Sequence, residues 1–490
     1  MDKKVLAIDF GASSGRAVIG RFDGERIALE EIHRFANEPV TLGGTMYWDF
    51  LRLFHEVKQS LIKAKQYGKV DSLGVDTWGV DFGLIDENGR LLDNPVHYRD
   101  SRTQGMLAEA FSLIPKESFY AVTGNQFMEI NTAFQLMAVQ KNRPDLLERA
   151  DKLLMMPNLF TFFLTGEKIT EQSIASTTQL YDQSGKCWAY RVAERLGIRE
   201  SLFTNILPAG TKIGTLSHDI MKELDIPDMD VIAVCGHDTQ SAMAAVPAQN
   251  TDFAFLSCGT WSLFGTELDG PLTDYPACEN CFTNETGFGG KTSFLKNIVG
   301  LWLLQETRRR WACEGREVSF ADMEKMAVEA EPFRCFIDPD DPRFVPAGDI
   351  PDRVRRSCAE SGQPVPETDG QVLRCIYESL ALKYRQALEG LEKCTGRHFD
   401  AIHMIGGGIR DRLLCKMTAN ACKRRVIAGP VEATALGNIA VQLIASGDIA
   451  DLSQARQVIA ASENVEVFEP DSPMQWDKAY EDIKLIFGGK

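Results

Sequence analysis

One pattern occurs twice in this sequence: an apolar strand, a turn of small residues and a second strand. The first copy covers residues 5–22 and the second covers residues 253–266. Two strands joined by such a short turn pair in antiparallel fashion. The repeat therefore predicts two lobes that each open on antiparallel strands, over residues 1–247 and 248–490.

The segments after the first copy alternate between strand and helix signals. Ile27–Phe35 and Val70–Asp76 have the apolar, β-rich composition of strands. Between them, Asp49 is a candidate N-cap for a helix whose apolar residues recur at helical spacing from Leu51 to Leu61. Mixed sheets flanked by helices, the arrangement of an α/β protein, are typical of this order.

The remainder of the chain extends the same pattern. Residues 100–230 are rich in helix formers and predict helical layers on the first sheet. Asp400–Ile405 is an apolar strand that ends in the triple glycine Gly406–Gly408. Further helices are predicted over residues 297–310, 320–330, 370–393, 411–422 and 432–446.

Composition narrows the range of partners. The chain of 490 residues carries a formal net charge of −16, so no global positive field attracts nucleic acid. The N-terminal apolar stretch is too short for a secretory signal, and Leu153–Leu164 is shorter than the ~20 residues of a bilayer span. We expect a cytoplasmic protein without a membrane partner, and the sequence implies no obligatory protein partner.

The 12 cysteines are sparse and irregularly spaced, which predicts reduced thiols rather than a disulfide framework. Cys278 and Cys281 form a C-x-x-C pair, but no second pair follows nearby to complete a zinc tetrahedron. Cys358 and Cys375 are predicted to lie on helical segments, and the sequence leaves open whether they meet. Free thiols are the expected state for all of them.

The first strand pair carries the residues of a magnesium–phosphate site. Asp9 ends a buried strand, and small residues follow whose backbone amides can approach an anion. Asp9 would hold Mg²⁺ through water, while Ser13, Ser14 and Arg16 would donate to phosphate oxygens. An ordinary hairpin with an aspartate near its turn remains the alternative.

A second small-residue turn, Ser257–Thr260, offers a hydroxyl where the first turn carries serines. Two such hairpins facing a cleft would bracket a triphosphate. The glycines Gly406–Gly408 at a strand end would let a base or ribose approach the backbone closely. The chain has neither the G-x-G-x-x-G phasing of a dinucleotide site nor a P-loop.

Gly236-His237-Asp238-Thr239 lies just before the second lobe. Asp238 is a candidate general base for a hydroxyl that attacks phosphorus, because such a transition state asks mainly for positioning. His237 would orient the substrate. The alternative is that Asp238 only caps the following helix.

Asp76-Thr77-Trp78-Gly79-Val80-Asp81 combines two acids, a tryptophan and a glycine without regular periodicity. This composition resembles a polyol-binding wall, since carboxylates accept sugar hydroxyls and an aromatic face covers C–H surfaces. Arg99 and its neighbours could add donors at the same rim. Core packing of Trp78 is the alternative.

Together these segments resemble the FGGY carbohydrate kinases, whose lobes belong to the actin, hexokinase and Hsp70 superfamily. Eight ordered blocks over nearly the whole chain carry the resemblance: IDFGASSGR, GVDTWGVDF, YRDSRT, GHDT, LSCGTWSL, KNIVGLWLLQE, IGGG and AGPVEATALGN. The resemblance implies a two-lobed, ribonuclease-H-like (actin-like ATPase) α/β fold with an interlobe cleft. It also implies ATP as a substrate and Mg²⁺ near Asp9.

The resemblance assigns roles residue by residue. It implies that Asp238 is the general base. The residues implied to contact ATP are Ala12, Ser13, Ser14, Gly15, Arg16, Thr260, Gln305 and Gly407. The residues implied to contact the sugar are Gly79, His237, Asp238, Thr239 and Asn297.

The implied reaction transfers phosphate from ATP to the C1 hydroxyl of the ketose L-rhamnulose. Another ketose, such as L-fuculose or L-ribulose, remains an alternative substrate. An ATP-driven conformational binder like actin or Hsp70 is the alternative from another class.

Overall fold

The computed structural model describes residues 3–248 and 252–487 and divides the chain into two compact units. Unit 1 comprises Met1–Gln249, Leu268–Phe294 and Ala433–Glu463, and unit 2 comprises Asn250–Glu267, Leu295–Glu432 and Asn464–Lys490. The first segment of unit 1 thus ends close to the boundary expected at residue 247. Two later segments of the chain also belong to unit 1.

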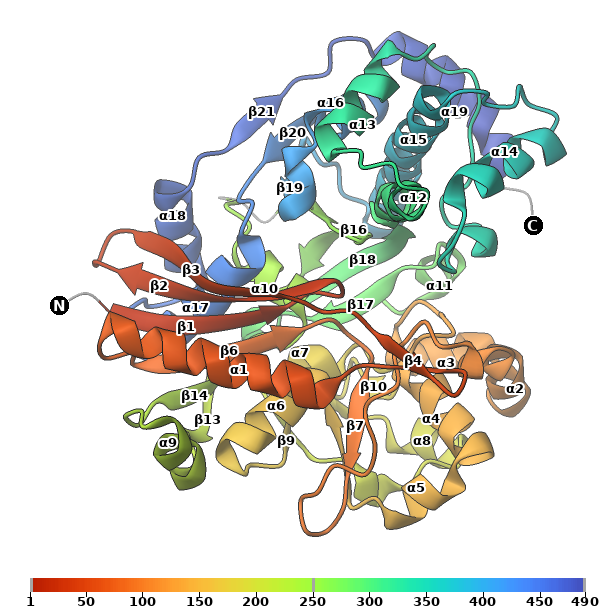
Figure 1. Ribbon diagram of the computed structural model, residues 1–490. Coiled ribbons are helices and arrows are strands. Elements are labelled where there is room, and N and C mark those ends of the chain that lie inside the picture. The colour runs from red at the N-terminus through yellow and green to blue at the C-terminus, as the bar shows by residue number, and fades with distance from the viewer. Residues whose placement is uncertain (1–2, 249–251, 488–490) are drawn as a thin grey trace. The chain divides into compact units, whose positions relative to one another are not determined.

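The sheet of unit 1 has the strand order β13-β14-β6-β1-β2-β3 (Figure 1). Its strands are β1 (Lys3–Phe10), β2 (Ser14–Phe22), β3 (Ile27–Ala36), β6 (Ser72–Thr77), β13 (Thr211–Thr215) and β14 (Asp230–Ala233). The two tight turns predicted from the sequence make β1, β2 and β3 consecutive antiparallel neighbours. β6 and β14 arrive by longer connections and pair in parallel, so the sheet is mixed.

Helices cover both faces of this sheet. α1 (Phe50–Ala64) and α6 (Met156–Thr165) pack their apolar side chains onto β1 and β6 in one hydrophobic core. α10 (Asp238–Ala244) and α17 (Ala433–Ala445) pack closely against each other, because a Cβ on Gly437 would lie 1.7 Å from the backbone oxygen of Ser241. Asp49 caps α1 as expected, accepting from the Arg52 amide.

The predicted helical region of unit 1 is present, with short strands between its helices. The helices are α2 (Met106–Leu113), α3 (Lys116–Thr123), α4 (Thr132–Asn142), α5 (Pro144–Arg149), α7 (Gln172–Ala175), α8 (Tyr190–Arg195) and α9 (His218–Leu224). The small strand pairs are β4 (Val40–Leu42) with β5 (Thr45–Tyr47), β7 (Phe82–Ile85) with β8 (Lys152–Met155), β9 (Ile169–Glu171) with β12 (Asn205–Leu207), and β10 (Tyr181–Asp182) with β11 (Cys187–Trp188). Later segments of unit 1 add α11 (Tyr275–Glu279), β17 (Thr283–Thr286) and α18 (Leu452–Ser462).

Unit 2 repeats the opening of unit 1. β15 (Ala254–Cys258) pairs antiparallel with β16 (Trp261–Leu268) and parallel with β19 (Ala401–Ile405). The order continues as β18-β16-β15-β19-β20-β21, with β18 (Thr292–Val299), β20 (Arg425–Ala428) and β21 (Glu466–Phe468). Its helices are α12 (Trp302–Cys313), α13 (Phe320–Glu329), α14 (Ile350–Glu360), α15 (Asp369–Thr395), α16 (Arg412–Cys422) and α19 (Pro473–Phe487).

The helix predicted over residues 297–310 is partly wrong. Asn297–Val299 complete β18, and α12 begins only at Trp302. The β-branched pair Ile298 and Val299 favours a strand, and this preference outweighs the capping tendency of an asparagine at residue 297. Asn297 is therefore a strand residue and not a helix cap.

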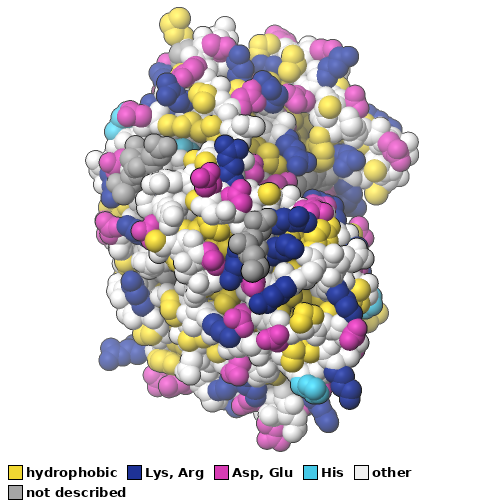
Figure 2. All heavy atoms as spheres, turned by 90° about the vertical axis from the view of Figure 1, so that its left-hand side faces the viewer, with side chains coloured by type: hydrophobic (Ala, Val, Ile, Leu, Met, Phe, Trp, Pro, Cys, Tyr) yellow, Lys and Arg dark blue, Asp and Glu magenta, His cyan; other side chains and the backbone are white. Residues whose placement is uncertain are grey.

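Lys and Arg side chains are interspersed with Asp and Glu on the face shown in Figure 2. Within the described ranges, no helix has the length and apolarity needed to cross a membrane.

Candidate active site

Three aspartates of unit 1 are brought to the same edge of the sheet. β1 pairs in parallel with β6, which places Asp9 opposite Asp76. Thr77 at the end of β6 bridges to His237, so Asp238 follows the neighbouring strand β14 at the same edge. Ligands of α/β sheets bind at the carboxyl ends of the strands, where these side chains lie.

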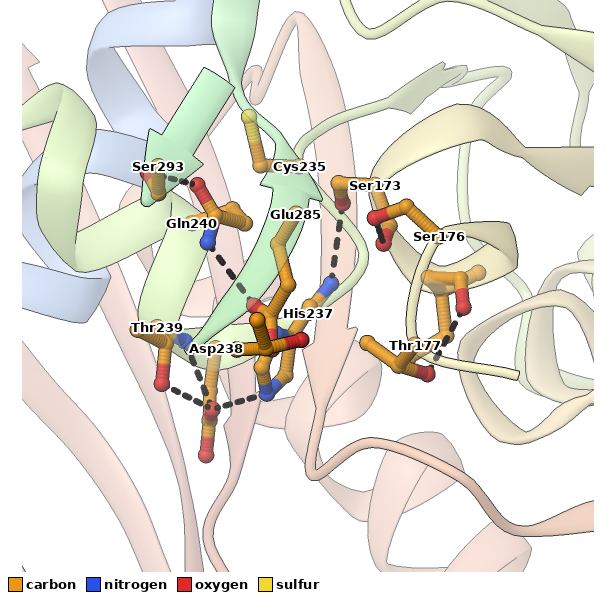
Figure 3. A network of polar contacts seen from close by, with 12 residues as sticks. Ser173, Ser176, Thr177, Cys235, His237, Asp238, Thr239, Gln240, Glu285 and Ser293 are labelled. Atoms are coloured by element: carbon orange, nitrogen blue, oxygen red, sulfur yellow. Dashed lines mark hydrogen bonds and ion pairs between the residues drawn. The ribbon is translucent and has the colours of Figure 1, made fainter. Parts of the chain in front are cut away.

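Asp238 presents one of its carboxylate oxygens outside the surrounding network (Figure 3). Its Oδ1 accepts from the Thr239 amide at 2.6 Å and from the Thr239 hydroxyl at 3.2 Å. Among the residues that the structure describes, none hydrogen-bonds to Oδ2, and the side chain is 28% exposed. His237 occupies the N-cap position of α10 and Asp238 is the first residue of the helix, with Oδ1 bonded to the Thr239 amide.

The proton affinity of Asp238 suits a base. Burial raises the pKa of its carboxyl to about 6, with the neighbouring Asp9 adding to the rise and His237 opposing it. A carboxyl group with this pKa is ionised near neutral pH and still binds a proton more readily than a free aspartate.

His237 lies between two carboxylates. Its Nδ1 contacts Oε2 of Glu285 at 2.8 Å, and its Nε2 lies 3.5 Å from Oδ1 of Asp238. Burial lowers the pKa of His237, but the carboxylates of Glu285, Asp238 and Glu171 outweigh it and raise the pKa to about 9. His237 is consequently an imidazolium at neutral pH, and its charge favours the ionised form of Asp238.

Further hydrogen bonds hold Glu285 in place (Figure 3). Gln240 donates to Oε2 of Glu285 at 2.9 Å, and the Ser293 hydroxyl donates to Gln240 at 2.7 Å. The next residue on β17, Thr286, donates its amide to the Ser176 hydroxyl at 2.9 Å. This chain of contacts fixes the carboxylate that orients the His237 ring.

Glu171 fixes the backbone that precedes His237. One of its oxygens accepts from the Gly236 amide at 2.9 Å and from the Ser173 hydroxyl at 2.6 Å. The Ser173 hydroxyl in turn accepts from the His237 amide at 3.2 Å. The buried carboxyl group of Glu171 therefore holds the loop that carries His237 and Asp238. Burial raises the pKa of Glu171.

Gly79 lies beside His237, where a side chain would not fit easily. A Cβ at Gly79 would lie 3.3 Å from His237 Nε2 and 3.4 Å from a Thr177 methyl group. The next residue, Val80, has a φ of 67°, which is costly for a β-branched residue. The hydroxyls of Thr132 and Thr177 bond the Val80 backbone and maintain this conformation.

Arg16 is engaged inside the first hairpin. Its Nε donates to Asp9 Oδ2 at 2.9 Å, because β1 and β2 place the two residues opposite each other. Of the predicted phosphate donors, Ser13 is exposed in the turn and Ser14 begins β2. The turn itself is closed by a bond from the Gly11 amide to the Ser14 carbonyl at 2.9 Å.

Asp76 is the most constrained of the three aspartates. It is fully buried, and its Oδ2 accepts from Asn438 at 2.5 Å. Its Oδ1 is buried without a hydrogen-bond partner among the described residues. Burial and then the adjacent Asp9 raise the pKa of Asp76 well above its usual range. An unpaired oxygen beside a second carboxylate fits a hard divalent cation, so these residues are compatible with Mg²⁺.

The predicted polyol-binding wall is wrong for two of its members, Trp78 and Asp81. Trp78 is only 4% exposed, and its indole nitrogen donates to Asp81. Asp81 is fully buried and accepts four hydrogen bonds, from Trp48, Trp78, Gln135 and the Tyr98 amide. Because its acceptor positions are filled, Asp81 supports the loop around Gly79 and does not offer an acceptor to a ligand.

Unit 2 brings together its own predicted site residues. The Thr260 hydroxyl donates to Gln305 Oε1 at 3.1 Å, and the Thr260 carbonyl accepts from the Trp302 amide at 3.1 Å. The triple glycine follows β19 beside β15, where a Cβ on Gly408 would lie 2.5 Å from the Cys258 sulfur. A Cβ on Gly407, in contrast, would meet nothing within 4 Å, so its backbone is open. Asn297 lies on β18 in the same unit.

Several residues that build the site were missed in the sequence. Glu285, Glu171 and Asn438 each supply a long-range hydrogen bond to the site, across 48, 65 and 362 residues respectively. No local periodicity marks such partners. Only Asn438 carried a local signal, as a polar residue inside an otherwise apolar segment.

The fold matches that of solved sugar kinases. Xylulose kinase from Lactobacillus acidophilus superposes with a TM-score of 0.82 at 16% identity, and the match covers 99% of both chains. The predicted α/β, actin-like ATPase fold is thereby confirmed.

Family models match both halves of the chain. The N-terminal domain of the FGGY family of carbohydrate kinases matches residues 4–245, and its C-terminal domain matches residues 254–446. The chain belongs to this family, and the protein is a sugar kinase.

Among its relatives are rhamnulokinases. The chain is 42% identical to the rhamnulokinase of Bacteroides thetaiotaomicron, with 98% of both chains covered. It is 41% identical to the rhamnulokinase of Oceanobacillus iheyensis, with 93% of this chain and 96% of the other covered.

Proposed function

We propose that the protein phosphorylates L-rhamnulose at the C1 hydroxyl with ATP, giving L-rhamnulose 1-phosphate and ADP, a step of L-rhamnose catabolism. Identities of 36–42% to rhamnulokinases over nearly the whole chain support this substrate. The observation that carries the chemistry is the carboxylate of Asp238. Its side chain is 28% exposed, one of its oxygens has no hydrogen-bond partner among the described residues, and it lies beside the imidazolium of His237.

In this reaction Asp238 Oδ2 takes the proton of the C1 hydroxyl while the hydroxyl oxygen attacks the γ-phosphorus of ATP. The bond from phosphorus to the β,γ-bridging oxygen breaks, and ADP leaves. Because the phosphoryl transition state is loose, positioning and charge stabilisation supply most of the rate enhancement. His237 keeps Asp238 ionised before the transfer, and Glu285 keeps His237 protonated.

Asp9 and Asp76 are the residues that would hold Mg²⁺. The ion, when bound, would neutralise charge on the phosphate oxygens. Asp9 keeps its contact with Arg16, which limits how strongly its carboxylate repels an approaching triphosphate. An acidic chain must bind an anionic nucleotide through such local compensation, since its net charge is unfavourable.

The remaining assignments concern the two substrates. For ATP we propose contacts with Thr260, Gln305 and Gly407 of unit 2, and with the hairpin residues Ala12–Arg16 of unit 1. The Thr260–Gln305 hydrogen bond and the open Gly407 backbone support the first set. The ketose contacts proposed are Gly79, His237, Asp238, Thr239 and Asn297.

We also propose that the enzyme acts in the cytoplasm, because its 12 cysteines are free thiols. The alternative of an ATP-driven binding protein is not favoured, since the relatives found over the whole chain are named as kinases of a sugar.

A panel of ketoses tests the substrate. ADP release is measured with L-rhamnulose, L-fuculose, L-ribulose and no sugar, with Asp238→Asn as the matched control at every condition. We expect kcat/KM to be highest for L-rhamnulose and ADP release without sugar to be near the level of the variant. Equal rates on all three ketoses would overturn the L-rhamnulose assignment, and sugar-independent ADP release would favour the ATP-driven binder.

A further inference from the structure

Three cysteine thiols meet in unit 2, away from the residues assigned above. Cys335 lies in the loop after α13, Cys358 lies on α14 and Cys375 lies on α15. Their sulfur atoms all lie within 4.8 Å of one another, and each residue is at most 2% exposed. Within the described part of the chain, this is the only group of three such side chains close enough to share a metal ion.

Hydrogen bonds hold the Cys335 loop against α15 and against the segment that follows α14. The amide and carbonyl of Phe336 both bond the side chain of Gln363, each at 2.8 Å. The Ile337 amide donates to the Ser379 hydroxyl at 3.0 Å, one turn beyond Cys375 on α15. The three sulfurs are consequently positioned by the fold before any ligand binds, as a metal site requires.

The three thiols also affect one another electrostatically. The neighbouring Cys358 and Cys375 side chains, together with Arg334, lower the pKa of Cys335. The contact with Cys335 raises the pKa of Cys358.

We propose that Cys335, Cys358 and Cys375 bind a thiophilic d¹⁰ cation, Zn²⁺ or Cu⁺, through their three sulfur atoms. All-sulfur ligands select soft ions and exclude Mg²⁺ and Ca²⁺. A metal–sulfur distance of about 2.3 Å places the sulfurs about 3.8–4.0 Å apart, so small movements from the observed spacing complete the site. All three sulfurs bind as thiolates, so the protons that they carry are released to solvent on binding.

The ion would join three segments that the chain brings together from different places. It would link the loop after α13 to α14 and α15, and thereby stabilise unit 2 against unfolding. None of the three cysteines is among the residues proposed for catalysis or for substrate binding. The site therefore affects stability, and kcat measured below the unfolding temperature should be independent of the ion.

The test uses full-length protein, reduced and stripped of metal with a chelator. Zn²⁺ or Cu⁺ is added separately, and bound ions per chain are counted by elemental analysis after gel filtration. Co²⁺ serves as a spectroscopic probe, since thiolate ligands give charge-transfer absorption. Cys335→Ser removes one ligand, while Cys422→Ser is the matched control because Cys422 is also buried in unit 2 but belongs to no such cluster.

We expect one ion per chain in the wild-type protein and in Cys422→Ser, with a higher Tm when it is bound. Affinity should fall by about a hundredfold or more in Cys335→Ser. Alkylation with peptide mapping needs no variant: in denaturant concentrations that partly open unit 2, all three thiols of the wild-type protein should react more slowly with the ion than without it.

Three results would overturn the proposal. The first is an absence of tight binding of either ion to the wild-type protein. The second is equal binding by Cys335→Ser, and the third is a disulfide between any two of the three cysteines that resists the reductant.

Discussion

The two units open with the same hairpin but equip it differently. In unit 1, β1 and β2 place Asp9 opposite Arg16, and the pair forms a partly buried salt bridge of 2.8 Å. In unit 2, the turn between β15 and β16 carries the neutral hydroxyl of Thr260, which bonds the neutral side chain of Gln305. The backbone pattern is shared, whereas the charge is confined to one copy.

The neighbouring strands extend this difference. Beside β1, β6 adds Asp76, and β14 leads to Asp238. Beside β15, β19 leads to the triple glycine, where the close approach of Gly408 to Cys258 leaves no room for a side chain. Beside its hairpin, unit 1 carries three carboxylates, whereas unit 2 carries neutral hydroxyl and amide groups and open backbone.

The comparison implies a division of labour between the units. Substitutions at the charged residues of unit 1 should mainly lower kcat, because they remove groups that act in the transition state. Substitutions at the neutral residues of unit 2 should mainly raise KM for ATP. Four substitutions test this division, and the expected loss of activity decreases from Asp238 to Thr260.

The largest effect is expected for Asp238→Asn. The amide cannot accept the proton of the attacking hydroxyl, so kcat should fall roughly 10²–10⁴-fold while ATP still binds. Steady-state kinetics with a nucleotide-binding assay measure both quantities. If turnover were retained, the base would lie elsewhere and the division of labour would lose its main support.

Asp9→Asn should lower kcat by about 10²-fold, since one of the two proposed Mg²⁺ ligands loses its charge. The matched measurement varies Mg²⁺ concentration, because a weakened metal site is partly restored by more metal. An unchanged Mg²⁺ dependence would show that Asp9 only pairs with Arg16 and holds no ion.

Glu285→Gln should lower kcat by about tenfold or more, because His237 loses the partner that keeps it protonated. KM for ATP should change little. Ser293→Ala is the control, as it removes a hydroxyl from the same network without touching His237. Equal losses in the two variants would point to general loosening of the network rather than to the charge of His237.

Thr260→Val should have the smallest effect. The substitution keeps the shape and removes the hydrogen bond to Gln305, which is worth about 0.5–1.5 kcal/mol. A loss of this free energy corresponds to a rise in KM for ATP of roughly 2–10-fold, and we expect kcat to stay nearly constant. A loss mainly in kcat would contradict the assignment of unit 2 to nucleotide binding.

Local structure was largely predictable from the sequence. Short turns determine the hairpins, and caps and apolar spacing determine the helices, so α15 lies within two residues of its prediction. The same local signals failed at residues 297–299, where a capping residue precedes two β-branched residues that pair in a sheet. Tertiary pairing decides such cases.

The chemistry of the site was only partly predictable. Asp9, Gly79 and Asp238 stand in short motifs, and the structure places them around one sheet edge. The wall around Trp78 was wrong because composition cannot distinguish an acid that meets a ligand from one whose bonds are filled internally. Glu285 was missed because its contact with His237 depends on the completed fold.

The pH dependence of kcat/KM tests most directly whether Asp238, whose pKa is raised by burial and lowered by His237, is the base. Activity requires the carboxylate, so kcat/KM should rise with pH through about 6, the pKa of Asp238, and fall away below it. This rise is the acidic limb of the pH profile. In Glu285→Gln, His237 should lose its positive charge, so the pKa of Asp238 should rise and the acidic limb should move to higher pH. A limb absent from the wild-type profile, or unmoved in the variant, would contradict the account.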